Sequence, residues 1–557
     1  MRPEEKLVIY QSFPRILTND CDHCVRGGTL AQNGSGKLNR ITPKLLRSLK
    51  SLGVNCMWYT GVIEHATKTA FEGIPADNPG VVKGEAGSPY AIKDYYDVAP
   101  ALAEQTGERV KEFEKLVERT HKAGMKVIID FVPNHTARVY RSDVKPGLDL
   151  GANDDKSVFF APDNNYYYLT GESFAPHFPV GDYTEVPAKA TGNDCFTASP
   201  GEYDWYETVK LNYGHDYRTG ADCFNPVPDT WRKMNAILDY WASKGVDGFR
   251  CDMCFMVPLA FWTWVIAELR KKYPDLLFIG EIYDVNSYRP FLEQGGFDYL
   301  YDKVNLYDTL KEVECHGAPT SRITGAWQWV NGLGPRMLNF LENHDEVRFA
   351  SREYAQDPDR VLPSLVVSSM LSTGPMMIYY GQELGEGAHD NEGFAGDNNR
   401  TTIFDYWSVD KIRRWYHEGK CDTTLLTKEE KALRKLYGKV LTLCNTEAAI
   451  AQGGFWDLMY VNPWSEHFNA DRNYAFLRHY GNETLLIVCN FSDAQEDIRV
   501  NIPADAFAAM GIPQGKMQVT ELLSGKTSEK TVSPAVPFET AIAAHGAVIY
   551  KITSPGK

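Results

Sequence analysis

Eight short apolar runs recur along this chain, and helical patterns of apolar and polar residues separate most of them. The first run, LVIYQSF at 7–13, is followed by ITPKLLRSLKSLG, in which leucines recur at helical spacing. The other apolar runs cover 54–61, 125–135, 246–252, 275–283, 297–303, 336–345 and 376–383. The helical patterns cover 41–53, 107–124, 229–245, 258–274, 287–296 and 360–374. Strands that alternate with helices build parallel sheets, so eight such units predict an α/β fold, the closed (β/α)8 TIM barrel.

Two stretches fall outside this alternation. Residues 136–227 are rich in Gly, Asp, Asn, Pro and Tyr and are too long for a simple loop, so we predict an inserted domain after the third strand. Residues 447–557 contain runs such as ETLLIVCNF, separated by Asp, Gly and Pro turns, which predicts a C-terminal antiparallel β-sandwich. The barrel domain then comprises residues 1–135 and 228–446.

Charge and hydropathy exclude some partners. Fifty-eight Lys and Arg against 73 Asp and Glu give a formal net charge of −15, which repels polyanions, so no nucleic acid is expected as a partner. The longest apolar stretch, 364–380, is broken by serines, a glycine and a proline, and no membrane span is expected. The start at Met1 has no signal-peptide pattern, which predicts a cytoplasmic protein as given, or a periplasmic or secreted one if a signal was removed. The oligomeric state stays unknown.

The eleven cysteines are odd in number, which favours a reducing compartment because at least one thiol stays unpaired within the chain. The pairs Cys21/Cys24 and Cys251/Cys254 imitate the spacing of a four-thiolate zinc site. Two observations argue against a zinc site. The second pair lies on either side of Asp252 at a predicted strand end, and most intracellular cysteines are single buried thiols. We therefore expect single thiols at these positions.

Polar side chains end four of the predicted strands. Side chains at the carboxyl ends of barrel strands surround a single opening, where barrel active sites are built. The four strands deliver Asp130, Asn134 and His135 (third), Arg250 and Asp252 (fourth), Glu281 (fifth), and His344 and Asp345 (seventh). Any one of these residues could be a helix cap or a solvated side chain, but together they predict a functional site.

Carboxylates that converge with an arginine and two histidines suit either a metal site or the cleavage of a glycosidic bond. Metal sites usually bring several ligands together at close spacing. Arg250 beside Asp252 instead predicts a lowered pKa for Asp252, which keeps this carboxyl ionised as a nucleophile requires. Glu281 lies in the apolar run FIGEIY, where we expect it to retain its proton. A carboxylate nucleophile beside a carboxylic acid is the pair that cleaves glycosides.

Four motifs carry a family resemblance. DFVPNH (130–135), GFRCD (248–252), GEIY (280–283) and ENHD (342–345) resemble, in order, the four signature regions of the α-amylase family of glycoside hydrolases, family 13. The stretches YAIKDYYDV, VKLNYG and GPMMIYYGQE add supporting matches, and the resemblance extends over nearly the whole chain. It implies a retaining reaction on an α-glucan or malto-oligosaccharide substrate, with no cofactor required for the chemistry.

The resemblance also implies a role for each matching residue. Asp252 is the implied nucleophile, which forms a covalent glucosyl intermediate, and Glu281 the general acid and base, with the two carboxyl groups about 5 to 5.5 Å apart. Asp345 is the third implied catalytic residue, because it would bind sugar hydroxyls more strongly in the transition state. The implied substrate-binding residues of the cleavage subsite are Tyr90, which stacks beneath the sugar ring, and His135, Arg250 and His344.

Three further positions are expected at the edge of the site. Asp397 and Arg400, in GDNNRTT, are expected either to contact the next glucose on the non-reducing side or to form a structural ion pair. Asn134 resembles a family calcium ligand between barrel and insertion, or else it is an amide that stabilises a loop. Structural calcium is therefore the one metal that the resemblance suggests.

One departure from the family pattern concerns the acceptor side. Many α-amylases carry a Lys-His pair three and four residues after the nucleophile, where it helps to bind the leaving-group sugars. This chain has Phe255 and Met256 there. Acceptor-side specificity is thus open, and endo cleavage of starch does not follow from the motifs.

The sequence therefore predicts a retaining glycoside hydrolase that cleaves α-1,4-glucosidic bonds of starch, maltodextrin or malto-oligosaccharides. One alternative is an α-glucan transglycosylase or sucrose-acting enzyme of the same family, which differs in the molecule that attacks the glucosyl intermediate. Another is a non-catalytic glucan-binding protein, which predicts that one of the three carboxylates is missing. All three carboxylates are present.

Overall fold

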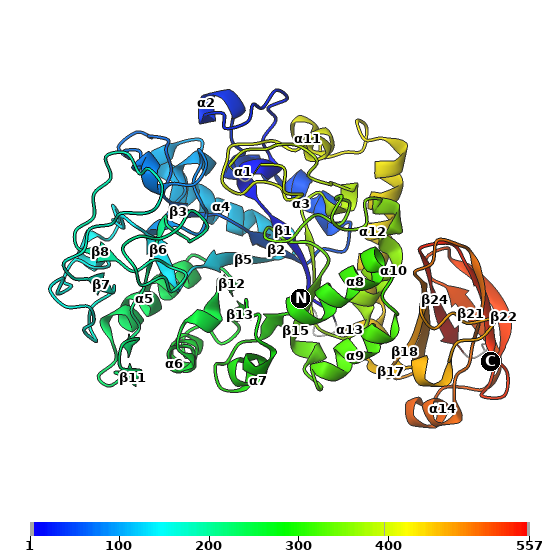
Figure 1. Cartoon of the computed structure of the whole chain (residues 1–557). Coiled ribbons are helices and arrows are strands. Elements are labelled where there is room, and N and C mark those ends of the chain that lie inside the picture. Colours follow the sequence, from blue (N-terminus) through cyan, green and yellow to red (C-terminus); the bar gives the residue numbers. More distant parts are fainter. Residues whose placement is uncertain (1–4, 395, 554–557) are drawn as a thin grey trace.

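The protein, described here from a computed structural model at residues 5–394 and 396–553, is built around a closed barrel of eight parallel strands (Figure 1). Seen around the barrel, the order is β1, β16, β15, β14, β13, β12, β5 and β2. The strand bounds are β1 Val8–Ser12, β2 Cys56–Tyr59, β5 Lys126–Phe131, β12 Gly248–Cys251, β13 Leu277–Gly280, β14 Tyr299–Tyr301, β15 Met337–Phe340 and β16 Met376–Tyr379. The predicted TIM barrel is confirmed, with strands shorter than the apolar runs.

Helices surround the barrel because each buries one apolar face against the strands. Their bounds are α3 Pro43–Lys50, α4 Arg109–Lys122, α5 Asp229–Ser243, α6 Leu259–Arg270, α7 Val285–Glu293, α8 Asp308–His316, α9 Ser321–Trp329, α10 Leu362–Met370 and α12 Lys428–Thr446. Short helices lie at α1 Pro14–Leu17, α2 Leu30–Asn33, α11 Asp410–Tyr416 and α13 Ala448–Ala451. The periodicity does not predict α8 and α9. These two helices bury only a few side chains each, and α9 has Gly325 near its centre.

Short antiparallel strand pairs stand outside the barrel between β5 and α5, where the inserted domain is predicted. They are β6 His135–Ala137 with β9 Thr208–Lys210, β7 Tyr168–Leu169 with β8 Ala188–Lys189, and β10 His215–Asp216 with β11 Ala221–Asp222. A small core of its own, centred on Phe159, Tyr167 and Phe174, holds the insertion together. The hairpin of β3 Ile63–His65 and β4 Ile92–Val98, which follows β2, is a second excursion that the sequence pattern does not predict.

The C-terminal region forms a six-stranded antiparallel sheet beside a two-stranded one, at the right of Figure 1. The larger sheet has the order β17 Gly454–Asp457, β18 Asn473–Tyr480, β19 Glu483–Asn490, β24 Gly546–Thr553, β21 Gly515–Glu521 and β22 Lys526–Val532. The smaller pairs β20 Glu496–Val500 with β23 Phe538–Ile542, and α14 Ala504–Met510 follows β20. Alternate side chains of both sheets share one apolar core, which confirms the predicted sandwich.

The helices and the cysteines both bear on predictions made from the sequence. Over residues 5–394 and 396–553, none of the helices has the length and hydropathy that crossing a lipid bilayer requires. All eleven cysteines have free thiols. Cys24 lies beside Ser408, whereas Cys251 and Cys254 are buried in the barrel, and no cluster of thiolates appears among the described residues.

Candidate active site

The register of the barrel strands brings the site together. Arg250 on β12 is paired in register with Asp130 on β5 and with Ile279 on β13, two residues before Glu281. Each of these strands ends shortly afterwards, so the following side chains open into the barrel mouth. The guanidinium of Arg250 is fully buried, and its Nε donates to the Tyr301 hydroxyl at 3.1 Å. Arg250 therefore forms the centre of the predicted cluster.

Both predicted catalytic carboxylates lie against this single guanidinium. Asp252 Oδ1 accepts from Arg250 Nη1 at 2.7 Å, and Glu281 Oε2 lies 2.7 Å from Nη2. Asp130 Oδ1 lies 3.4 Å from Nη1. Because two neighbouring nitrogens of one rigid fork each hold a carboxylate, Asp252 and Glu281 lie side by side and face the same space.

Glu281 is held by polar donors rather than by an apolar surround, so the predicted apolar environment of this acid is wrong. Its Oε2 also accepts from the Met253 backbone N–H at 2.8 Å, and its Oε1 lies 2.5 Å from the Tyr283 hydroxyl. Tyr283, which the sequence places among the apolar flanks, turns its hydroxyl towards the carboxyl group. Both oxygens of the Glu281 carboxyl group thus have polar neighbours, Oε2 the Met253 N–H and the Arg250 guanidinium, and Oε1 the Tyr283 hydroxyl.

Burial raises the pKa of the Asp252 carboxyl well above its usual range, although Arg250 acts in the opposite direction and Glu281 adds to the rise. The prediction of a lowered pKa is therefore wrong. The physical reason is that Arg250 is shared among three carboxylates, so its charge does not offset the burial of any one of them. Burial likewise raises the pKa of Asp130 to about 6, again against the effect of Arg250.

These raised pKa values predict the acid side of the pH profile. Asp252 must lose its proton to act as a nucleophile, and a raised pKa moves that loss to higher pH. We expect kcat/KM to fall on acidification at a pH clearly above the pKa of about 3.9 of an exposed aspartate. The measurement is the pH dependence of kcat/KM on a short glucan. A half-maximal point at or below about pH 4 would show that burial does not control this group.

His344 and Tyr90 line the wall of the mouth beside the carboxylates. Their rings stack with centroids 5.2 Å apart, and the Tyr90 hydroxyl lies 2.5 Å from His344 Nε2. Gln11 Nε2 lies 2.9 Å from His344 Nδ1, and Asp345 Oδ2 lies 3.1 Å from Nε2. Burial, reinforced by Arg250, lowers the pKa of His344 well below its usual range, so the imidazole is neutral. Tyr90, His344 and Asp345 thus join the predicted cluster.

The insertion closes the site from the side of β6 and β9. His135 lies at the start of β6 with its ring centroid 5.3 Å from that of Trp205. Burial lowers the pKa of His135 to about 3. Lys83 Nζ lies 3.0 Å from Glu207 Oε2 on the same wall. A pocket of about 310 Å³ is lined by these four residues together with Ser88, Tyr90, Thr208, Asp252, Met253, Glu281, Tyr283, Asp345, Ile403 and Phe404. It brings the predicted catalytic trio and the insertion into one concave site.

The two outermost predicted residues, Asp397 and Arg400, bind different partners. Arg400 Nη1 donates to the backbone carbonyl of Asp345 at 2.7 Å, so it supports the loop that carries the third carboxylate. Asp397 instead forms an ion pair with Arg352 and is partly exposed. For Asp397 the structure agrees with the structural ion pair, although the partner is Arg352.

A lysine ammonium occupies the position expected for calcium. Asn134 is fully buried; its Nδ2 donates to the Gly192 carbonyl at 2.7 Å, and its Oδ1 accepts from Lys210 Nζ. The same ammonium lies 2.7 Å from Asp194 Oδ1 and 3.1 Å from the Met256 carbonyl. These oxygens would suit a hard cation, but Lys210 already supplies a positive charge at their centre. The residues therefore do not fit a calcium ion.

This arrangement predicts independence from calcium. Treatment with a chelator is expected to leave both the rate and the unfolding temperature unchanged. Replacing Lys210 by Met is expected to destabilise the fold by about 2 to 4 kcal/mol, because it strands a buried amide oxygen and a carboxylate. Urea unfolding measures the stability of the chelator-treated protein and of the Lys210→Met variant. The matched control is Lys145→Met, since Lys145 is exposed. A chelator-induced fall in stability of the wild-type protein would contradict this account.

A second cluster of carboxylates could in principle hold a metal ion. Ligand atoms of Glu64, Asp94 and Asp97 lie within 4.8 Å of one another, the single such cluster among the described residues. Arg109 Nη2 lies 2.5 Å from Asp97 and 3.4 Å from Glu64. Burial raises the pKa of Glu64 to about 7. Two of these carboxylates thus pair with Arg109, and the third, Asp94, accepts from the backbone N–H groups of Tyr96 and Asp143.

Several residues of the site escape prediction. Trp205 and Lys83 come from irregular loops, whose path no periodic pattern sets. Lys210 stands in the quoted stretch VKLNYG, but nothing in that stretch shows that its side chain replaces a cation. Phe255, which takes the place of the family's lysine, contacts Tyr283 with ring centroids 6.3 Å apart. Phe255 therefore places a second aromatic ring beside the tyrosine that contacts Glu281.

The sequence of the chain is similar to those of known proteins. The model of the α-amylase catalytic domain matches residues 26–424. A cyclomaltodextrinase of Bacillus sp is 23% identical over 517 residues, which cover 88% of this chain and 74% of that protein. The α-amylase MalA of Haloarcula japonica is 24% identical over 387 residues, which cover 69% of this chain but only 44% of that protein. A human amino acid transporter heavy chain is 23% identical over 544 residues, or 86% of this chain and 71% of that protein.

Solved structures show the same fold. The maltogenic α-amylase AmyB from Thermotoga neapolitana superposes with a TM-score of 0.62 at 20% identity, over the full length of both chains. The α-amylase from Geobacillus thermoleovorans, solved with acarbose, gives 0.63 at 18% identity over 99% of both chains. The barrel, with carboxylates gathered at its mouth, defines a glycoside hydrolase. More specifically, the chain belongs to the α-amylase family.

Proposed function

We propose that this enzyme hydrolyses α-1,4-glucosidic bonds with retention of configuration and acts on short malto-oligosaccharides. The observation that carries the proposal is the pair of carboxylates on one guanidinium, Asp252 and Glu281, each 2.7 Å from Arg250 at the barrel mouth. Retaining glycosidases use two carboxyl groups about 5 to 5.5 Å apart, one to attack the sugar and one to protonate the leaving oxygen. Two carboxylates beside neighbouring nitrogens of one guanidinium support such a separation. A non-catalytic glucan-binding protein has no need of this arrangement.

In the first half of the reaction Asp252 acts as the nucleophile. Its Oδ attacks C1 of the sugar while the bond from C1 to the glycosidic oxygen breaks, and that oxygen takes the proton of Glu281. The carboxyl group of Glu281 is positioned for this transfer by the Met253 N–H and Arg250 beside Oε2 and by the Tyr283 hydroxyl beside Oε1. Arg250 stays beside both groups, so its positive charge balances the carboxylate that Glu281 becomes.

In the second half Glu281 acts as the base. Its carboxylate takes a proton from a water molecule as the water oxygen attacks C1, and the bond from C1 to Asp252 breaks. Two inversions at C1 return the α configuration. Asp345, beside the neutral His344, binds sugar hydroxyls, and this binding accelerates the reaction where it strengthens in the distorted transition state.

The size of the site supports a short substrate. The active-site pocket of about 310 Å³ lies at the small end of the roughly 300 to 1,000 Å³ typical of ligand sites. The insertion closes it on one side through Trp205 and Glu207. On the acceptor side Phe255 and Tyr283 offer aromatic faces on which a sugar ring can stack. This enclosure favours a few glucose units over a long chain running through an open cleft.

Product analysis tests the proposal. Timed digestion of maltoheptaose is expected to give shorter malto-oligosaccharides, and NMR spectroscopy is expected to show the α anomer as the first product. Products longer than maltoheptaose would identify a transglycosylase, and activity on sucrose alone a sucrose-acting enzyme. The β anomer as first product would rule out retention, and no cleavage of any glucan would leave only a binding role.

We further propose that the protein works in a reducing compartment, as cytoplasmic proteins do. The eleven free thiols support this, because oxidising compartments favour paired cysteines. Thiol titration of the unfolded protein, prepared without a reductant, is expected to find all eleven. A stoichiometry lower by two or more would reveal disulfides and overturn this proposal.

A further inference from the structure

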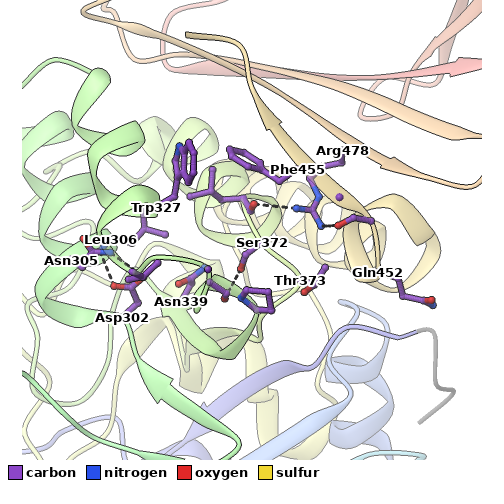
Figure 2. Close-up of a pocket in the computed structure, with 17 residues that line it drawn as sticks. Asp302, Asn305, Leu306, Trp327, Asn339, Ser372, Thr373, Gln452, Phe455 and Arg478 are labelled. Carbon is purple, nitrogen blue, oxygen red and sulfur yellow. Dashed lines mark hydrogen bonds between the residues drawn. The ribbon is translucent and has the colours of Figure 1, made fainter. Parts of the chain in front are cut away.

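A second pocket, which we name the junction pocket, lies between the barrel and the C-terminal sheet (Figure 2). Its volume is about 440 Å³, which exceeds that of the active-site pocket and falls within the range of ligand sites. The barrel contributes Asn339 of β15 and residues that follow β14 or precede β15 and β16. The C-terminal region contributes residues of β17, the two residues before it, and Arg478 of β18. It shares no lining residue with the active-site pocket.

Aromatic rings form one wall of the junction pocket. Trp327 of α9 and Phe455 of β17 contact edge to face, with centroids 5.3 Å apart and planes at 69°. The indole N–H of Trp327 donates to Asp457 Oδ2 at 2.8 Å, and Thr324 donates to the same oxygen at 2.6 Å. The ring is thus fixed in place while one part of it remains exposed. A fixed aromatic face is what an apolar ligand face needs for stacking.

Buried oxygens line the opposite side of the junction pocket. Asp302 is 4% exposed and accepts from the Leu306 N–H at 3.0 Å and from Asn305 Nδ2 at 3.4 Å. Within the described part of the chain no cationic side chain forms an ion pair with it. Asn339 is 3% exposed, and its Oδ1 has no partner although its Nδ2 donates to the Ser368 carbonyl. A buried oxygen without a hydrogen-bond donor costs free energy of folding. A ligand with hydroxyl or amide groups would supply the missing donor.

Charged side chains at the two ends of the junction pocket determine which class of ligand can bind there. The carboxylate of Asp302 disfavours anions. At the other end, Arg478 is 1% exposed and already donates to the carbonyls of Gly453, Ala449, Leu371 and Ile450. Its positive charge disfavours cations, and four of its five N–H donors are already used, so it cannot hold a carboxylate or phosphate ligand with two parallel hydrogen bonds. A neutral ligand with many hydroxyls and one apolar face satisfies both ends, and this is the chemistry of a sugar.

We propose that the junction pocket is a second binding site for an α-glucan of about the size of maltose. The choice of α-glucan among neutral sugars rests on the proposed function, because the substrate is the sugar that the enzyme meets. A ring would stack on Trp327, and its hydroxyls would donate to Asn339 Oδ1 and Asp302. A second site on the same chain raises the effective concentration of glucan near the active site.

Affinity electrophoresis through soluble starch tests the site in the full-length enzyme. Trp327→Ala is expected to raise the dissociation constant for starch about tenfold, the loss of one aromatic stacking contact. The matched control is Trp329→Ala, since Trp329 lies on the same helix, is 68% exposed and does not line the pocket. Asp302→Asn, which keeps the side-chain shape, is a second variant, and a several-fold weaker affinity is expected. Cleavage of maltotriose should be unchanged in all three.

The outcomes separate the two proposals. If wild-type enzyme cleaves maltotriose while Trp327→Ala and Asp302→Asn bind starch as tightly as the wild type does, the second site is overturned and the proposed function stands. Equal loss of affinity in the Trp329 control also overturns it. If the wild type binds starch through Trp327 but cleaves no glucan, the second site stands and the proposed function fails. If it neither binds nor cleaves glucans, both are overturned.

Discussion

Replacing Asp252 by Asn is expected to lower kcat by about 10⁴-fold or more, because the reaction loses the group that bonds to C1. Asn keeps the shape of the side chain and an oxygen that can accept from Arg250 Nη1, so the fold is expected to persist. The measurement is the rate of reducing-end release, with circular dichroism to check the fold. Asp497→Asn is the matched control, since Asp497 is exposed on the distant strand β20.

Two results would contradict this expectation. Activity within about tenfold of the wild type would show that Asp252 is not the nucleophile. Equal losses in Asp252→Asn and Asp497→Asn would show that the assay reports on stability and not on chemistry. The corresponding change Glu281→Gln removes the proton donor and is expected to affect substrates with good leaving groups less, because these need little protonation.

Replacing Arg250 by Ala is expected to lower the free energy of unfolding by about 3 to 5 kcal/mol and to abolish activity. The change leaves Asp130, Asp252 and Glu281 buried together without a cation, and removing one partner of a buried charge group strands the others. Urea unfolding of the full-length protein measures the effect. The control is Arg289→Ala, which breaks an exposed ion pair with Glu293 and should cost under about 1 kcal/mol.

The penalty of Arg250→Ala should also depend on pH. A carboxyl group whose pKa is raised by folding contributes stability below its unfolded pKa and loses it as the pH rises through its folded pKa. Asp130 already has a pKa of about 6 in the presence of Arg250, and loss of the arginine raises it further. The destabilisation should therefore be largest at neutral pH and shrink on acidification. A penalty independent of pH would mean that lost packing, not charge, is the cause.

The barrel could be predicted because its strands are buried on both faces. Such strands read as continuous apolar runs, and β1, β5 and β12 all lie inside the predicted stretches. The helices α8 and α9 could not be predicted because they bury few side chains and their pattern is weak. The same holds for the β3–β4 hairpin, whose short strand β3 carries both glutamate and histidine.

The centre of the site could be predicted because strand ends fix it. Once β12 and β13 are neighbours, Asp252 and Glu281 must open into the same mouth, whatever the loops do. The pKa shifts and the ion pairs of the site could not be predicted from the positions of the strand ends. The pKa of Asp252 depends on how many carboxylates share Arg250, and the role of Lys210 depends on a fold of the insertion that leaves Asn134 Oδ1 beside its ammonium.

Mass spectrometry of a trapped intermediate tests the nucleophile most directly. The enzyme is incubated with a fluorinated α-glucosyl fluoride, which attaches readily but hydrolyses slowly, and is then digested with a protease. A glycosyl group is expected on the peptide that spans GVDGFRCDMC, at position 252, with none in the Asp252→Asn variant. A label on another residue, or a substrate turned over with no covalent species at any time, would contradict a mechanism in which this aspartate bonds to the sugar.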